Sequence, residues 1–267
     1  MKKITLLLVA ATMVLVCACG NNPGKKKTEA KESVEEQYIK ADLKIKLDSL
    51  VKEMGRLSTP VIVDIQNGKL TLTDKEKRNK PSYLLPASKA DEAVTLNEKY
   101  RAVAMLSADM TIAELYGMPV DSYKQAISKL LVDINNPALT VGGTEGQSTE
   151  SLETKIQKFY DESVKTGTAN LFWEAIVAGT VEQLYIITQN IDKFMPCFTD
   201  ETASEVSYRF ILVHEGVKSL IPYHPELEQL QTILKPLEVI NAINVQQLRD
   251  QLLELKGAIE TARGQLL

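Results

Sequence analysis

The segment from residue 169 to residue 194 constrains the fold more than any other, because apolar side chains occur around most of its girth. Its main stripe has spacings of three and four residues, which is the period of an α-helix and not of a strand. The stripe consists of Trp173, Val177, Val181, Leu184, Ile187, Ile191 and Phe194, and Phe172, Ile176, Tyr185 and Ile186 widen it. Such a helix needs partners on several sides, so we expect it to be central, with Trp173 buried.

Most of the remaining chain shows the same period. Further helices are predicted at residues 33–54, 89–117, 121–132, 151–164, 202–220, 226–242 and 245–266. Pro236 should kink or break the helix at 226–242, because proline lacks the N–H that a helix interior requires. Asn244, followed three residues later by Gln247, is typical of a helix N-cap.

The helix at 245–266 carries a narrow apolar seam with the spacing of a heptad repeat. The seam consists of Val245, Leu248, Leu252, Leu255, Ile259, Ala262 and Leu266. A long coiled coil would use such a seam for oligomerisation. Because this seam covers only about three repeats, we predict that it packs inside the monomer, against the first helix or the Trp173 helix.

One stretch, PVIVDIQNGKLTLTD, departs from the helical pattern. Asn67-Gly68 is the favoured pair for a two-residue hairpin turn. Across that turn Gln66 would pair with Lys69, Ile65 with Leu70, Asp64 with Thr71 and Val63 with Leu72. Apolar residues meet apolar residues and polar meet polar, as a strand pair requires. The predicted fold class is mainly α, a multi-helix bundle or array with one short β-hairpin near residues 61–73.

The N-terminus has the organisation of an export signal. Lys2 and Lys3 precede an apolar run from Ile4 to Val16, which is too short to cross a bilayer core comfortably. The run ends in Val16-Cys17-Ala18-Cys19, which resembles the lipobox of bacterial lipoproteins. The resemblance implies cleavage after Ala18 and acylation of Cys19. Two alternatives are an ordinary secretory signal cut after Ala18 and, less favoured, a redox or metal pair of cysteines.

These observations divide the chain into a lipoprotein signal peptide at 1–18, a disordered tether at 19–32 and a single helical domain at 33–267. The tether lacks large apolar residues, so it cannot form a core. Gly20 follows the acylated cysteine where enteric lipoproteins of the inner membrane have Asp. The resemblance therefore implies a cell-envelope protein anchored in the outer membrane, with membrane lipid as a partner through Cys19.

A second resemblance concerns the run YLLPASKADEAVTLNEKYRAVAMLSADMTIAELYGMP. It is similar to segments of uncharacterised helical lipoproteins from Gram-negative anaerobes. It covers about a seventh of the chain and implies neither an activity nor a site residue.

Composition excludes one large class of partners. The formal net charge is −4, and removal of Lys2 and Lys3 with the signal peptide makes it −6. An acidic chain is poorly suited to neutralise phosphates, so we expect no nucleic-acid partner.

Three acidic residues are candidates for chemistry. Asp109 falls inside an apolar stripe, where a partly buried carboxyl group would have a raised pKa. A hydrogen bond to a neighbouring tyrosine or backbone group is the more common role for such a residue. Glu174 and Glu182 lie two turns apart on the central helix, where we interpret them as its polar edge.

The remaining reactive side chains form no recognised motif. His214 and His224 lack partners at zinc-ligand spacing, so no metal site and no cofactor are predicted. Cys197 lies in an apolar helix end and is interpreted as a buried small side chain. Gly142 to Gly146 form a glycine-rich loop that lacks the lysine of a phosphate-binding loop. No catalytic residue is assigned, and lipidation of Cys19 is the one site prediction.

The sequence thus favours a lipid-anchored envelope module that binds another envelope protein or a glycan, without catalysis. Two alternatives stay open. One is an envelope hydrolase whose carboxylates are brought together by the fold. The other is a structural lipoprotein that self-associates through the seam at 245–266.

Overall fold

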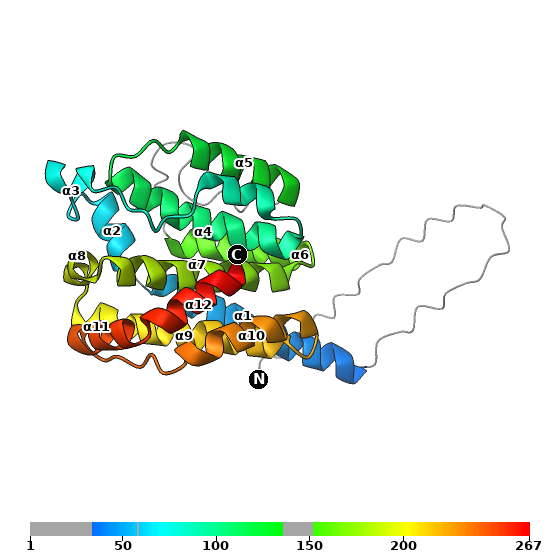
Figure 1. Cartoon of the computed structure of the whole chain (residues 1–267). Coiled ribbons are helices and arrows are strands. Elements are labelled where there is room, and N and C mark those ends of the chain that lie inside the picture. The colour runs from blue at the N-terminus through cyan, green and yellow to red at the C-terminus, as the bar shows by residue number, and fades with distance from the viewer. Residues whose placement is uncertain (1–33, 58, 136–151) are drawn as a thin grey trace, which may run out of the picture.

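The computed structural model describes residues 34–57, 59–135 and 152–267 (Figure 1). Within these ranges every regular element is a helix and no residue belongs to a β-strand, which confirms the mainly α fold class. The predicted signal peptide at 1–18, the predicted lipidation site Cys19, the predicted tether at 19–32 and the predicted loop from Gly142 to Gly146 lie outside the described residues. None of the described helices is long and apolar enough to cross a membrane.

The longer elements are the α-helices α1 (Val34–Arg56), α4 (Leu96–Leu115), α5 (Asp121–Ile134), α6 (Leu152–Lys165), α7 (Ala169–Gln189), α9 (Asp200–Leu220), α11 (Val245–Glu254) and α12 (Lys256–Leu266). Short α-helices between them are α2 (Pro60–Gln66), α3 (Asp74–Arg78), α8 (Ile191–Phe194) and α10 (Glu228–Leu234). Short 3-10 helices are η1 (Ala87–Glu92), η3 (Met195–Cys197), η4 (Pro225–Leu227) and η5 (Lys235–Leu237).

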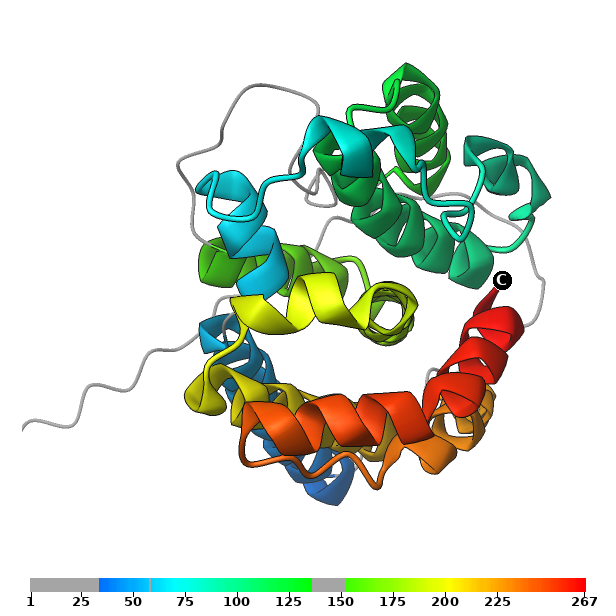
Figure 2. The ribbon, with the colours of Figure 1, turned by 60° about the vertical axis from the view of Figure 1, so that its left-hand side comes forward.

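Helix α7 is the central element, as its apolar girth predicts. It contacts α4, α6, α9, α11 and α12, and Figure 2 looks nearly along its axis with other helices around it. Trp173 is fully buried, with its ring edge-on to Phe172 at a centroid distance of 5.3 Å. The prediction for Trp173 is therefore confirmed.

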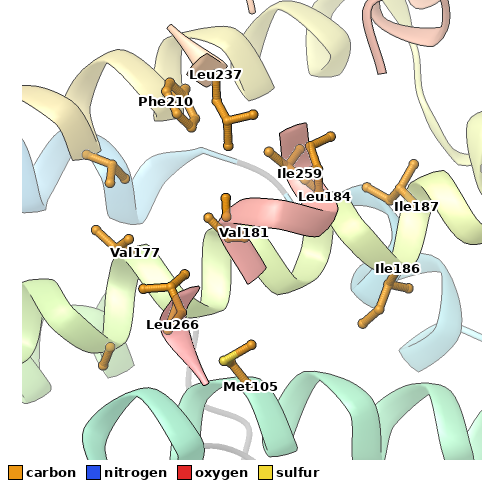
Figure 3. Packing of buried hydrophobic residues seen from close by; sticks show 14 of the residues in the cluster. Met105, Val177, Val181, Leu184, Ile186, Ile187, Phe210, Leu237, Ile259 and Leu266 are labelled. Carbon is orange, nitrogen blue, oxygen red and sulfur yellow. The ribbon is translucent and has the colours of Figure 1, made fainter. Parts of the chain in front are cut away.

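One hydrophobic core runs through the domain. Around α7 it joins Met105 of α4, Phe210 of α9 and Ile259 of α12 (Figure 3). All fully buried apolar residues of the described chain lie between Leu47 and Leu266. The chain from Gly20 onward thus contains the whole described core.

The predicted β-hairpin at residues 61–73 is wrong. Pro60 opens α2, where a missing N–H costs nothing, and the helix ends at Gln66 with Asn67 as its C-cap. Gly68 follows with a left-handed φ of 67°. Its N–H donates to the Ile65 carbonyl at 3.1 Å, and the next N–H, that of Lys69, donates to the Asp64 carbonyl at 2.9 Å. These two bonds form a Schellman motif at the helix end.

The error has a simple physical origin. A type I′ turn and a Schellman motif both need a residue with positive φ, so Asn-Gly suits either. Packing decides between them. Val61 and Ile65, four residues apart, both pack on the core from one face of α2, and Leu70 and Leu72 are buried in the segment that follows. Two strands alone would have been marginally stable.

Several predicted helix boundaries also shift. The helix predicted at 89–117 is interrupted after η1, and α4 begins after Thr95, which forms a capping box with Glu98. The helix predicted from 202 begins at Asp200, with Thr199 as N-cap. The helix predicted at 226–242 is shorter and ends in η5, whose first turn contains Pro236.

The C-terminal segment divides at Leu255 into α11 and α12 instead of forming one helix. Asn244 is the N-cap of α11 and accepts the N–H of Gln247 at 2.9 Å, as predicted. Leu248, Leu252, Ile259, Ala262 and Leu266 of the seam are buried, and both helices contact α7. The seam therefore packs inside the monomer, as predicted, with the Trp173 helix as a neighbour.

Candidate functional site

The central helix buries two glutamates. Glu174 and Glu182 are 1% and 0% exposed, so their interpretation as a polar edge of α7 is wrong. Buried carboxylates are stable only when cations or hydrogen-bond donors compensate for the lost hydration. The fold supplies one arginine for each, from a different neighbouring helix.

Glu174 is paired with α4. The Nε of Arg101 donates to its Oε2 at 2.6 Å, and Asn97 Nδ2 donates to its Oε1 at 2.8 Å. Both carboxylate oxygens are thus satisfied, and Arg101 is itself only 9% exposed. This compact three-residue group joins α4 to α7.

Glu182 is paired with α12. The Nε of Arg263 donates to both carboxylate oxygens, at 3.1 and 2.8 Å, and its Nη2 donates to Oε1 at 2.8 Å. The guanidinium lies over the ring of Tyr185, 3.9 Å from its centroid, and also donates to the carbonyl of Tyr83 at 3.2 Å. Arg263 therefore fastens the last helix to the centre of the domain.

Asp109 lies beside this pair and is 0% exposed. Its Oδ2 accepts the backbone N–H of Leu85 at 2.9 Å, which is a backbone hydrogen bond of the kind predicted for it. Among the described residues Oδ1 has no hydrogen-bond partner. The nearest guanidinium nitrogen, Arg263 Nη2, is 3.8 Å from Oδ2. Desolvation and the adjacent charge of Glu182 raise the pKa of Asp109 to about 9.

The two carboxyl groups and Arg263 form a buried cluster with one proton on Asp109 at neutral pH. Desolvation raises the pKa of Glu182 as well, but the bidentate contact with Arg263 opposes this shift. A raised pKa is a common property of catalytic acids. Here, however, all three side chains are too buried to contact a substrate. The cluster therefore has a structural role, because it links α4, α7 and α12.

A pocket lies elsewhere in the described domain, between α2, α4, α7 and α9. It encloses about 660 Å³ of empty space, part of which is open to solvent. Eleven of its fifteen lining residues are apolar: Pro60, Val61, Ile62, Ala108, Ile112, Leu184, Ile186, Ile187, Phe198, Val206 and Phe210. Figure 3 shows Leu184, Ile186, Ile187 and Phe210 on the α7 and α9 sides. A mostly apolar lining with a few polar groups is typical of small-molecule sites.

Four polar side chains complete the lining: Thr59, Thr180, Gln183 and Arg209. Thr180 and Gln183 lie three residues apart on α7, so they share a face of that helix. Arg209 Nη2 donates to the carbonyl of Leu57 at 2.8 Å, which joins α9 to the end of α1. Burial of its guanidinium outweighs the attraction of Glu205 and lowers the pKa of Arg209 to about 10.

The other predicted candidates are not brought together. His214 Nδ1 lies 3.2 Å from Glu238 Oε1, and His224 Nδ1 lies 3.1 Å from Glu226 Oε1. The two histidines thus belong to separate pairs. Cys197 is partly buried, and desolvation raises the pKa of its thiol to about 11, which keeps it protonated. In the described ranges no group of three or more His, Cys, Asp or Glu side chains is arranged to hold a metal ion.

Sequence reasoning missed the three arginines. For Arg263 a signal existed, because it lies four residues after Ile259 and three before Leu266, on the buried face of α12. No comparable pattern marks Arg101 or Arg209, whose partners come from distant parts of the chain. Thr180 and Gln183 read as the polar edge of an apolar helix, and only the arrangement of α2 and α9 makes them pocket residues.

No protein-family model, curated protein or solved structure matches the chain.

Proposed function

We propose that the protein is a lipid-anchored binding protein of the cell envelope, held in the outer membrane through acylated Cys19, and that its helical domain binds an apolar small molecule. The observation that carries the binding function is the pocket between α2, α4, α7 and α9. Such a pocket exposes apolar surface to water unless a ligand covers it, which favours occupation. Another envelope protein or a glycan remains the alternative partner proposed from the sequence.

The structure supports binding over hydrolysis. A carboxylate hydrolase needs two acids that converge on an accessible cavity. Asp109 and Glu182 converge, but they are fully buried and do not line the pocket. The pocket lining contains no aspartate, glutamate, histidine or cysteine, so it lacks the usual general acids and bases.

Self-association through the seam at 245–266 loses its main support. Leu248, Leu252 and Ile259 are fully buried within one chain and cannot face a second copy.

The anchor is tested by metabolic labelling with a palmitate analogue in cells that express the full chain. We expect labelling of the wild type and none of Cys19→Ala, because Cys19 is the acceptor by position in the lipobox-like sequence. Cys17→Ala is the matched control and should keep the label. Label that persists in Cys19→Ala would contradict the anchor.

Ligand binding is tested with the chain from Gly20 onward, which contains the described core. The neutral fluorescent probe N-phenyl-1-naphthylamine should bind and brighten. Ala108→Leu adds bulk to the pocket wall and should weaken binding, whereas Ala126→Leu makes the same change on α5, outside the pocket. Absence of probe binding, or equal binding to both variants, would refute the pocket as the binding site.

A further inference from the structure

We propose that the ligand of this pocket is a neutral amphiphile, an apolar chain with one uncharged hydroxyl or carboxamide head that hydrogen-bonds to Thr180 and Gln183. This inference rests on the proposed function, because it names the class of molecule for the same pocket. It depends on the charge of the lining, on the polar side chains that have no partner in the protein and on the positions of polar and apolar residues along α7.

The lining offers a ligand no free charge. It contains no acidic residue, lysine or histidine, and Arg209 is its one charged side chain. Arg209 is already engaged within the protein, because its Nη2 donates to the Leu57 carbonyl at 2.8 Å and Glu205, one turn earlier on α9, attracts its positive charge. Both charged residues have further interactions in the chain. An ionic head would therefore lose hydration at an apolar wall without gaining a free counter-ion, whereas a neutral head loses much less.

Two neutral side chains are available for hydrogen bonds to a ligand. Thr180 and Gln183 line the pocket from one face of α7, and neither side chain hydrogen-bonds to another described residue. Both are partly buried, so a ligand that covers them must replace their hydrogen bonds to water. A pure hydrocarbon cannot do this. A hydroxyl or a carboxamide can, because each of these groups both donates and accepts.

The polar and apolar parts of the α7 wall follow one another along the helix. Thr180 and Gln183 come first, and Leu184, Ile186 and Ile187 follow toward the C-terminal end. Ile187 is seven residues after Thr180, which is about 10 Å along the helix axis. This order suits a molecule with its head at one end and an apolar chain at the other. A glycan, with hydroxyl groups along its whole length, would leave several of them unpaired against the apolar part.

The test compares two isomers that differ in hydrogen bonding. Octan-1-ol and heptyl methyl ether have the same formula, but the alcohol donates and accepts, whereas the ether only accepts. Their dissociation constants, and that of octanoate, are measured at pH 8 by displacement of N-phenyl-1-naphthylamine from the chain from Gly20 onward. Octanol should bind more tightly than octanoate, which is ionised at this pH and finds no free counter-ion in the pocket.

Two variants test the contact with the head. Thr180→Val and Gln183→Met nearly preserve the size of each side chain but remove its hydrogen-bonding groups. Each should weaken octanol binding by about 2- to 12-fold, the usual contribution of one neutral hydrogen bond. Heptyl methyl ether, which has no proton to donate, should lose less affinity than octanol. The naphthylamine probe should keep its affinity, because the apolar wall is unchanged.

Matched substitutions outside the pocket are the controls. Gln189→Met lies on the same helix, where Gln189 Nε2 donates to Glu260 at 3.2 Å, and Thr232→Val lies on α10. Neither control should change octanol binding. Probe binding and the melting temperature verify that the pocket variants are folded. If one of them does not fold, the other decides; if neither folds, the wild-type comparison of octanol with octanoate decides.

The outcomes distinguish the two levels of proposal. Octanoate binding as tight as that of octanol, or tighter, would overturn the neutral head. Octanol affinity that is unchanged in Thr180→Val and Gln183→Met, or that falls no more than that of the ether, would overturn the contact with these residues; blocking by Ala108→Leu would then leave the apolar pocket. Probe binding without binding of either isomer would overturn the inference alone. Failure of both isomers and of the probe would overturn the inference and the proposed function together.

Discussion

The buried carboxyl group of Asp109 makes a specific prediction about the dependence of stability on pH. In the folded protein its pKa rises from 3.8 to about 9, because the side chain is desolvated and faces Glu182. The unfolded chain keeps the ordinary value. Between about pH 4 and pH 9 the folded state therefore binds one proton more than the unfolded state. Stability must then fall as the pH rises through this range.

The magnitude follows from the linkage relation. One extra proton in the folded state lowers the free energy of unfolding by about 1.4 kcal/mol for each pH unit. From pH 6 to pH 8 the expected loss is therefore about 3 kcal/mol. Paired acids such as Glu76, whose pKa is lowered to about 2, are ionised in both states above pH 6 and contribute no slope there. Any proton that Glu182 holds acts in the same direction, since its pKa is also raised.

Asp109→Asn tests this reasoning, because asparagine resembles the protonated acid. Its carbonyl can accept the N–H of Leu85, and its amide can donate toward Glu182. Urea unfolding at several pH values, followed by the emission of Trp173, gives the free energy of unfolding. We expect the variant to match the wild type near pH 5, to exceed its stability at pH 8 and to lose most of the slope.

The control is Asp192→Asn, which changes an exposed carboxylate 2.7 Å from Arg249 and should leave the slope intact. A different result would refute the argument. If Asp109→Asn is several kcal/mol less stable than the wild type at pH 8, Asp109 is ionised there and Arg263 serves both carboxylates. A wild-type stability that does not change between pH 6 and pH 8 would lead to the same conclusion.

Two further predictions concern packing. Gly216→Ala should cost about 3 kcal/mol or more, because a Cβ atom there would lie 2.1 Å from Cη2 of Trp173. In contrast, Gly264→Ala, with nothing within 4 Å of the added atom, should be neutral or stabilising; equal melting temperatures of the two variants would contradict the packing. Leu252→Asp should cost several kcal/mol, because Leu252 is 0% exposed, whereas Leu253→Asp, at a residue that is 46% exposed, should cost little. If Leu252→Asp kept its melting temperature while light scattering showed an oligomer falling to monomer mass, the seam would belong to a subunit interface.

The spacing of apolar residues in the sequence determined where the helices form and which helix lies at the centre of the domain. A helix with apolar side chains around its girth can be stable only at the centre, and α7 with Trp173 lies there because no other position buries that surface. The spacing of the apolar residues in the seam at 245–266 likewise predicted that these residues are buried. Local capping chemistry also succeeded where donor and acceptor are close in sequence, as for Asn244 with Gln247.

Tertiary structure decided wherever a local signal has two solutions or a partner is distant in sequence. Asn67-Gly68 suits both a hairpin and a helix end, and the burial of Val61 and Leu70 selected the helix. Glu182 could be interpreted as a solvated edge until α12 placed Arg263 beside it, 81 residues away. Arg209 and the α7 face with Gln183 line one pocket only because the fold brings residues of α2, α7 and α9 around it. Sequence periodicity specifies which face of a helix is buried, but the neighbour that covers it depends on how all the helices pack together.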